Sequence, residues 1–300
     1  MTSSRNYPRA AFLASVVFAG WPLSDALMKI AQDAGVSQGE ILMIFGLGSM
    51  ATIFLLSVFR GRLGDLRPHN KKGLVVLGLC QLVGFIFWML ALPRLPLANM
   101  YIVSFLTPMA VACLAAVFLK ESLGWNRAFV IAAGFAGVVV AVNPSNLFQH
   151  IDSGLPYLFL FGNMAGSSIQ MFLLRVVADK ERSECVAFYP RVFLTLGGFV
   201  FCLVTGFTAI TPWIFFVLCV SGALGGIGWN LLAQAYRHAP AAAVAPFQYS
   251  QMIWGALFGY LVWNDVPNAY LLCGSAIIIA SGVTLIRHER RISRTMPRLD

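Results

Sequence analysis

A carboxylate, an ammonium and an indole lie one helical turn apart near the start of the chain. Trp21, Asp25 and Lys29 are spaced four residues apart within an apolar stretch that begins at Ala10. Residues four apart share a face of an α-helix, so the two charges can meet if residues 10–31 are helical. A charge in hydrocarbon costs about 2.5 kcal/mol or more and should therefore face protein or water. We interpret this face as one wall of a pathway for a solute.

The composition predicts an integral membrane protein. Hydrophobic residues make up 59% of the 300 residues and charged residues only 11%, with a mean hydropathy of +0.77. The formal net charge of +9 could indicate nucleic-acid binding, but the basic residues are scattered along short loops instead of being gathered on one face. We therefore expect the lipid bilayer as a partner and no nucleic acid.

Segments of about 20 apolar residues follow one another along the chain, and each is long enough to cross a bilayer. An all-α integral membrane fold with ten transmembrane helices is therefore predicted. The expected spans are 9–31, 39–59, 73–93, 97–119, 125–143, 155–177, 186–208, 212–236, 240–263 and 268–286.

The basic residues predict how these helices are oriented. If the N-terminus is cytoplasmic, the cytoplasmic segments hold all of the 21 Lys and Arg residues except Lys29, Arg94 and Arg191. Cytoplasmic loops are enriched in Lys and Arg, so both termini are predicted to be cytoplasmic. Residues 5–19 resemble a weak secretory signal, but the first span has a partner in an internal repeat, and we expect it to be retained.

That repeat predicts two halves. A shift of about 145 residues aligns residues 95–98 (Leu-Pro-Leu-Ala) with 239–242 (Ala-Pro-Ala-Ala), and places Asp25 opposite Gln170. We expect a first repeat at 1–145 with helices 1–5, and a second at 146–300 with helices 6–10 and a basic cytoplasmic tail. Because five spans are an odd number, the second repeat should be inverted, with a central cavity between the two.

The segments that carry the repeat resemble those of the drug/metabolite transporter superfamily, in its ten-helix EamA-type branch. The resemblance covers essentially the full length. The chain departs from the usual pattern at Asp265, where Glu is frequent, and at Phe45-Gly46, where many relatives have Arg. The segments that match are 95–99, 105–108, 118–125, 134–138, 245–250, 265–267 and 281–282.

This resemblance implies secondary active transport of a small organic metabolite across a bacterial inner membrane by alternating access, without a cofactor. The riboflavin and S-adenosylmethionine uptake branch looks closest, and an amino-acid-like solute also fits. One alternative is an aromatic amino acid or drug exporter of the same superfamily. An integral-membrane enzyme acting on lipid is the alternative from another class, although the carboxylate or His cluster that it needs is not evident. A monomer or a homodimer is compatible with the resemblance.

Polar and aromatic residues inside the spans are the candidate solute contacts. Amides and hydroxyls at membrane depth need partners, which a solute or a neighbouring helix can supply. Aromatic rings give a cavity flat apolar walls. The candidate substrate-binding residues are Trp21, Asp25, Tyr101, Asn163, Gln170, Asn230, Gln248, Tyr249 and Trp254.

Ion coupling, with protons as the candidate ion, is assigned to Asp25 and Lys29. Two alternatives stay open: the two residues form a static pair, or Lys29 extends to the membrane interface. Arg191, near the start of its span, either contacts an anionic solute group or reaches the inner interface. Trp88 is expected in an interfacial belt of aromatic residues.

Catalytic and metal chemistry find little support in the sequence. The four histidines fall in loops or at the ends of spans, and the six cysteines have no CxxC spacing, so no metal site is predicted. The glycines of span 8 are expected to permit close helix contact. Pro22, Pro108, Pro190 and Pro246 can break helices beside a cavity.

Overall fold

The computed structural model describes residues 7–118, 125–142, 151–178, 181–238 and 245–295, and these residues form a helical bundle without strands. Every predicted span has a helical counterpart. The helices are α1 (Tyr7–Asp33), α2 (Gln38–Phe59), α3 (Lys71–Ala91), α4 (Leu97–Ser104), α5 (Thr107–Phe118), α6 (Trp125–Val142), α8 (Ile151–Ala178), α9 (Ser183–Thr205), α10 (Pro212–His238), α12 (Ser250–Trp263) and α13 (Ala269–Thr295). Two short 3₁₀ helices are η1 (Leu63–Leu66) and η2 (Ala245–Tyr249).

Length and composition make the described helices α1, α2, α3, α9 and α10 suitable for crossing a membrane. Large apolar side chains on the outside of the bundle are exposed, among them Phe12, Phe59 and Val204. A surface of this kind is stable against lipid, because lipid tails are as apolar as these side chains. The protein is therefore a multi-pass membrane protein.

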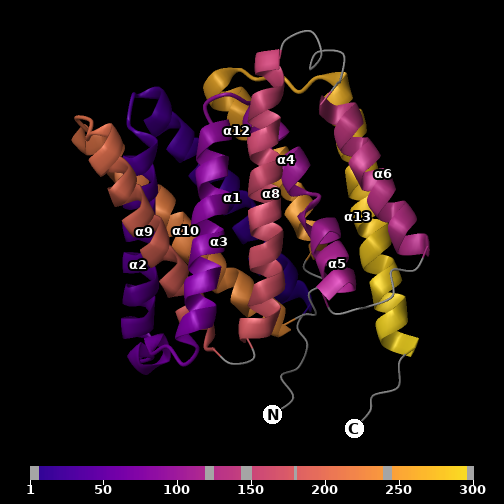
Figure 1. The fold of residues 1–300 in the computed structure, drawn as a ribbon, viewed down its shortest axis with the longest axis horizontal. Coiled ribbons are helices and arrows are strands. Elements are labelled where there is room, and N and C mark those ends of the chain that lie inside the picture. Colours follow the sequence, from indigo (N-terminus) through magenta and orange to yellow (C-terminus); the bar gives the residue numbers. More distant parts are fainter. Residues whose placement is uncertain (1–6, 119–124, 143–150, 179–180, 239–244, 296–300) are drawn as a thin grey trace.

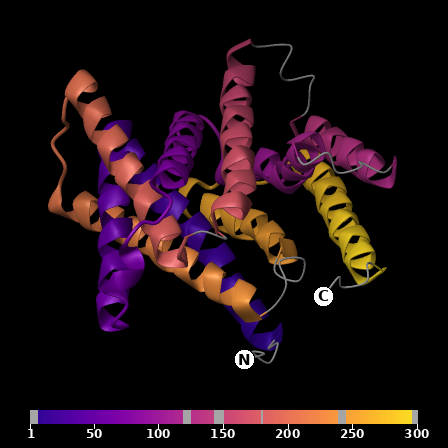
Figure 2. The same cartoon turned by 60° about the horizontal axis from the view of Figure 1, so that its bottom comes forward.

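The main helix contacts join the early part of the chain to the late part. Helix α1 packs on α10, α2 on both α9 and α10, α3 on both α8 and α9, and α6 on α13. In Figure 1, α2 and α9 lie at one edge and α6 and α13 at the other, and Figure 2 keeps the latter two together. Helix α12 packs on α1 and α4, while α8 packs on α4 and α5.

Small residues permit the closest of these contacts. A Cβ atom on Gly198 of α9 would lie 2.6 Å from the carbonyl oxygen of Gly39 on α2. On α10, a Cβ on Gly222 would lie 2.6 Å from the carbonyl oxygen of Phe45. The prediction that the glycines of span 8 permit close helix contact is therefore confirmed at Gly222.

The fourth and ninth spans are not single helices, and prolines account for both interruptions. Pro108 has no backbone N–H to donate to Ser104, and the chain divides there into α4 and α5. Pro246 lies in η2, just before α12. Pro22 and Pro190, in contrast, lie within the continuous helices α1 and α9, so the expectation of a break is wrong at these two positions. Residues 239–244, where the ninth span was predicted to begin, lie outside the described part.

Helix ends follow local sequence signals. Ser37 caps α2, its hydroxyl accepting a hydrogen bond from the Glu40 backbone N–H at 3.3 Å. The Glu40 carboxylate also accepts a bond from the backbone N–H of Thr208 at 3.0 Å, which ties the α9–α10 loop to α2. Helix α9 ends at Thr205 instead of the predicted residue 208, because Gly206 adopts a φ of 89° that ends a helix.

At the opposite end of the bundle, the segment around η1 is held against the start of α9. Glu181 accepts hydrogen bonds from the backbone N–H groups of His69, at 2.6 Å, and Asn70. Arg182 pairs with Asp65, and Tyr189 donates to the carbonyl oxygen of Leu66 at 3.2 Å. We call these contacts the loop clasp. The first residues of α1 and the last residues of α13 lie at this same end (Figure 1).

Candidate functional site

A cavity of about 240 Å³ lies at the centre of the bundle, where helices from both parts of the chain meet. It is lined by side chains from α1, α2, α3, α4, α8, α9, α10, η2 and α12. The lining residues are Trp21, Ser24, Asp25, Phe45, Gln81, Phe85, Trp88, Tyr101, Ser104, Asn163, Ser167, Gln170, Arg191, Gly225, Trp229, Gln248 and Gln251.

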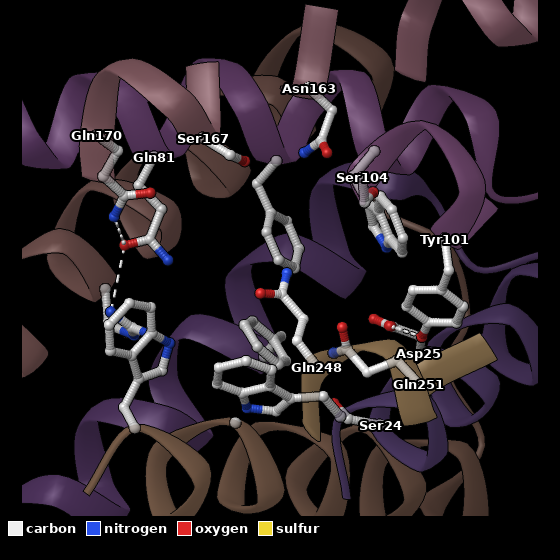
Figure 3. A pocket seen from close by; sticks show the side chains of 17 residues that line it. Ser24, Asp25, Gln81, Tyr101, Ser104, Asn163, Ser167, Gln170, Gln248 and Gln251 are labelled. Carbon is white, nitrogen blue, oxygen red and sulfur yellow. Dashed lines mark hydrogen bonds between the residues drawn. The ribbon is translucent and has the colours of Figure 1, made fainter. Parts of the chain in front are cut away.

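Asp25 and Tyr101 form one side of this cavity. The Tyr101 hydroxyl donates a hydrogen bond to a carboxylate oxygen of Asp25, joining α1 to α4 (Figure 3). The Trp88 ring lies 5.8 Å from the Tyr101 ring, so the tyrosine is held from a second direction. Tyr101 is itself buried. Such a carboxylate can receive a proton, or a hydrogen bond from a cationic group of a solute.

Three polar side chains form a connected group on the other side. Arg191 Nη1 donates to Gln81 Oε1 at 3.2 Å, and Gln170 Nε2 donates to the same oxygen at 3.3 Å. Figure 3 shows Gln81 and Gln170 well separated from Asp25 and Tyr101 across the cavity. The Arg191 guanidinium lies over the Trp229 ring, 4.9 Å from its centre, which is favourable for a cation.

Aromatic rings and small hydroxyls complete the lining. The rings of Trp21 and Trp229 lie 5.9 Å apart, and those of Phe45 and Phe85 stack at 5.1 Å. Ser24 exchanges hydrogen bonds with Ser221 of α10, each hydroxyl lying 3.0 Å from the other residue's carbonyl oxygen. The site therefore has polar groups on opposite sides and flat apolar surfaces between them.

Six of the nine candidate substrate-binding residues line this cavity. They are Trp21, Asp25, Tyr101, Asn163, Gln170 and Gln248. They come from four separate segments of the chain, α1, α4, α8 and η2. Asn163 is further fixed by a 2.9 Å bond from its amide to the Gly84 carbonyl oxygen. Sequence spacing alone could not show that these segments meet.

The other three candidates lie outside the lining. Asn230 accepts hydrogen bonds from Arg60 at 2.6 Å and from Gln234 at 3.0 Å. Tyr249 is buried with its ring against Phe105, and Trp254 stacks on Phe258. A role of these three in solute binding stays a prediction that their positions do not support.

Asp25 and Lys29 do not form the pair that their spacing allows. The Lys29 ammonium donates to the carbonyl oxygen of Leu95 at 2.8 Å and lies over the Trp263 ring, 4.9 Å from its centre. Trp263 in turn donates to Asp33 at 2.6 Å. The interfacial position stays a prediction for Lys29, which is buried within the bundle. Lys29 therefore ties α1 to the α3–α4 loop and to the end of α12.

At three lining residues the structure goes beyond the sequence interpretation, which misplaced Trp88, left Arg191 between two positions and omitted Gln81. Trp88 lines the cavity and is buried, so the expected interfacial position is wrong. Arg191, for which an interfacial position was one alternative, is only 2% exposed and faces the cavity. Gln81 was missed, although a lone amide in the apolar span 73–93 is the same signal that identified Gln170.

No metal centre stands out among the described residues, where no three His, Cys, Asp or Glu side chains gather in a way that could hold an ion. The cavity lining is instead suited to an organic solute, because it combines aromatic surfaces with a few hydrogen-bonding groups.

A helical membrane bundle around a central polar cavity, with helices broken beside it, is the architecture of solute transporters. The chain belongs to the EamA-like transporter family, whose sequence model matches it twice, at residues 8–143 and 154–287.

Named relatives carry several kinds of solute. The S-adenosylmethionine uptake transporter of Rickettsia bellii is 26% identical over 220 residues, covering 72% of this chain and 73% of the relative. The riboflavin transporter of Rhizobium johnstonii is 28% identical and covers 80% of each chain. The pseudopaline exporter of Pseudomonas aeruginosa is 23% identical and covers 93% of this chain and 95% of the relative.

A solved crystal structure shares the fold. Its TM-score is 0.65 at 16% sequence identity, and the match covers 97% of this chain and 99% of the other. The likeness extends over nearly the whole of both chains.

Proposed function

We propose that this protein is a secondary transporter that moves a small organic metabolite through the central cavity by alternating access. The observation that carries the proposal is the cavity itself, which is lined from both parts of the chain by polar and aromatic side chains. Family membership and the names of the relatives support the same class of function. S-adenosylmethionine, riboflavin and amino-acid-like solutes are the candidate substrates.

We further propose that the two halves, residues 1–145 and 146–300, are inverted repeats that rock about this cavity. Support comes from the helix contacts, which keep their pattern when the halves are exchanged. The α1–α10 contact corresponds to α3–α8, the α2–α10 contact to α3–α9, and the α1–α12 contact to that of α8 with α4 and α5. The two family matches divide the chain at nearly the same place.

Asp25 is our candidate for coupling transport to a proton gradient, since it is an acidic side chain in the cavity lining. A role of Lys29 in ion coupling has less support, because its ammonium donates a hydrogen bond to the Leu95 carbonyl oxygen outside the cavity lining. We place the protein in a bacterial inner membrane with both termini cytoplasmic, which is supported by the distribution of Lys and Arg. A monomer contains the whole cavity, although a homodimer is also compatible.

Tracer flux into proteoliposomes tests the proposed function. The panel contains S-adenosylmethionine, riboflavin, and aromatic and aliphatic amino acids, each with and without a proton gradient of either direction. We expect saturable flux for one class of solute, and its direction shows whether the protein imports or exports. If folded, inserted protein carries none of these solutes, the substrate assignment is wrong.

A further inference from the structure

Arg191 is a buried cation for which the described residues provide no carboxylate. No described carboxylate lies within 4.0 Å of the Arg191 guanidinium, and the ion pairs among the described residues involve other side chains. Its Nη1 donates to the neutral Gln81 amide, and its buried Nε has no hydrogen-bond partner. A guanidinium has five N–H donors in a planar fork that matches a carboxylate. A buried charge without a counterion is costly, so an anionic partner would stabilise it strongly.

The carboxylate of Asp25 is in the matching situation on the opposite side. Its partner is the Tyr101 hydroxyl, which is neutral, and the nearest cation along α1, Lys29, donates to a backbone carbonyl instead. The cavity thus has a positive side chain, Arg191, on one wall and a negative side chain, Asp25, on the other. The two do not pair with each other. The Trp229 ring lies against Arg191, and 5.9 Å from it lies the ring of Trp21, which shares α1 with Asp25.

From this arrangement we infer that the transported solute is a zwitterion with well-separated charges, whose carboxylate binds Arg191 and whose cationic group faces Asp25. The inference rests on the proposed function and adds the substrate class to it. Arg191 becomes a specificity-determining residue, with Gln81 and Gln170 as the groups that position it. The rings of Trp21 and Trp229 provide a surface for the part of the solute that joins the two charges.

Binding of two closely matched probes to the full-length protein tests this inference. S-adenosylmethionine carries a carboxylate and cationic groups, and decarboxylated S-adenosylmethionine lacks only the carboxylate. Tryptophan fluorescence reports occupancy, because Trp21 and Trp229 line the cavity. We expect wild-type protein to bind the acid about ten- to hundredfold more tightly, as hydrogen bonds to charged groups contribute about 1.5 to 3 kcal/mol.

Variants then assign the discrimination to one side chain. Arg191→Met should bring the affinities for the two probes to within about threefold, and Arg191→Lys should give an intermediate ratio, because an ammonium cannot pair in the same bidentate way. Arg67→Gln is the matched control, since it removes one positive charge from an exposed position far from the cavity lining. It should leave the ratio unchanged.

Three results would overturn the inference: equal affinity of the wild type for both probes, binding of neither, or discrimination that survives in Arg191→Met. The wild-type comparison is decisive even if Arg191→Met fails to insert. Binding with discrimination but without flux would contradict the proposed transport and leave standing only the zwitterion as the ligand of the cavity. Flux of uncharged riboflavin by protein that binds neither probe would support transport and contradict the inference.

Discussion

Asp25 and Lys29 lie one turn apart on α1, and the bundle gives each a different partner. A carboxylate and an ammonium at this spacing would attract each other in an isolated helix. Here Tyr101 reaches Asp25 from α4, while the Leu95 carbonyl and the Trp263 ring hold Lys29. Asp25 is therefore left facing the cavity, where a proton or a solute can reach it.

Replacing Asp25 by Asn tests its role in coupling. The amide can still accept a hydrogen bond from Tyr101, but it cannot take up and release a proton. We expect Asp25→Asn to abolish accumulation driven by a proton gradient and to retain exchange of solute across the membrane, with a higher KM because the charged partner of the solute's cationic group is lost. Flux in proteoliposomes with and without the gradient measures both activities.

Lys29→Gln is the control for this experiment, because Lys29 lies outside the cavity lining. Transport by Lys29→Gln protein should still respond to the proton gradient. Its melting temperature should be lower, since the contacts of the ammonium with Leu95 and Trp263 are lost. An unchanged gradient response in correctly inserted Asp25→Asn protein would show that the proton is carried elsewhere.

At the scale of elements, the contact between α2 and α9 depends on glycine. The space that a Cβ atom on Gly198 would need is already occupied by the backbone of α2. We expect Gly198→Ala to destabilise the protein by about 1 to 3 kcal/mol, the usual cost of overpacking. Thermal unfolding in detergent should show a lower midpoint.

Gly20→Ala is the matched variant, because a Cβ atom on Gly20 of α1 would meet nothing within 4 Å. Alanine favours a helix by up to about 1 kcal/mol over glycine, so this variant should be as stable as the wild type or more stable. Equal midpoints for Gly198→Ala and Gly20→Ala would contradict the close packing of α2 and α9.

The loop clasp makes a second prediction for the elements. Glu181 accepts bonds from two successive backbone N–H groups, at His69 and Asn70, and so fixes the segment that joins η1 to α3. Glu181→Ala should release this segment and increase trypsin cleavage after Lys71 and Lys72, which directly follow it, several-fold. The rate of limited proteolysis, compared with cleavage after Arg94 in another loop, measures the effect. If cleavage near this segment rises no more than cleavage after Arg94, the loop clasp does not restrain the segment.

At the scale of the whole molecule, the distribution of charge predicts the orientation. Alkaline phosphatase fused after residue 300 should be inactive, and a fluorescent protein fused there should fold and fluoresce, because only the latter matures in the cytoplasm. Fusions in the outer loop that contains Arg94 should behave in the opposite way. Active phosphatase at the C-terminus would reverse the assignment of the two faces.

The helices could be predicted from the sequence more fully than the site. Long apolar segments bounded by polar loops locate all the spans, because the bilayer leaves a helix little alternative. The break at Pro108 and the continuity at Pro22 could not be told apart, since the same residue type occurs in both settings and packing decides the outcome. Periodicity also shows which residues share a helix face, and this was enough to predict that Trp21 and Asp25 lie on the same side of their helix.

What the sequence could not show is which faces meet. Arg191 is near the end of its span if that span begins at residue 186. Helix α9 begins at Ser183, however, and its packing against α3 turns Arg191 toward Gln81. Trp88, near the end of α3, is of a residue type that is common at membrane interfaces, but its side chain is buried. Both depend on tertiary contacts, which for Arg191 join segments about 100 residues apart and for Trp88 join α3 to Tyr101 of α4.

The contacts between α1 and α10, α2 and α9, α3 and α8, and α6 and α13 have a consequence for synthesis in the cell. Each of these pairs joins a helix made early to one made late, so α1, α2 and α3 enter the membrane before their principal partners exist. During that interval their glycine-lined and polar faces, including Asp25, must be exposed to lipid or held by the insertion machinery. We therefore expect the half-made chain to be more vulnerable to degradation than the complete protein.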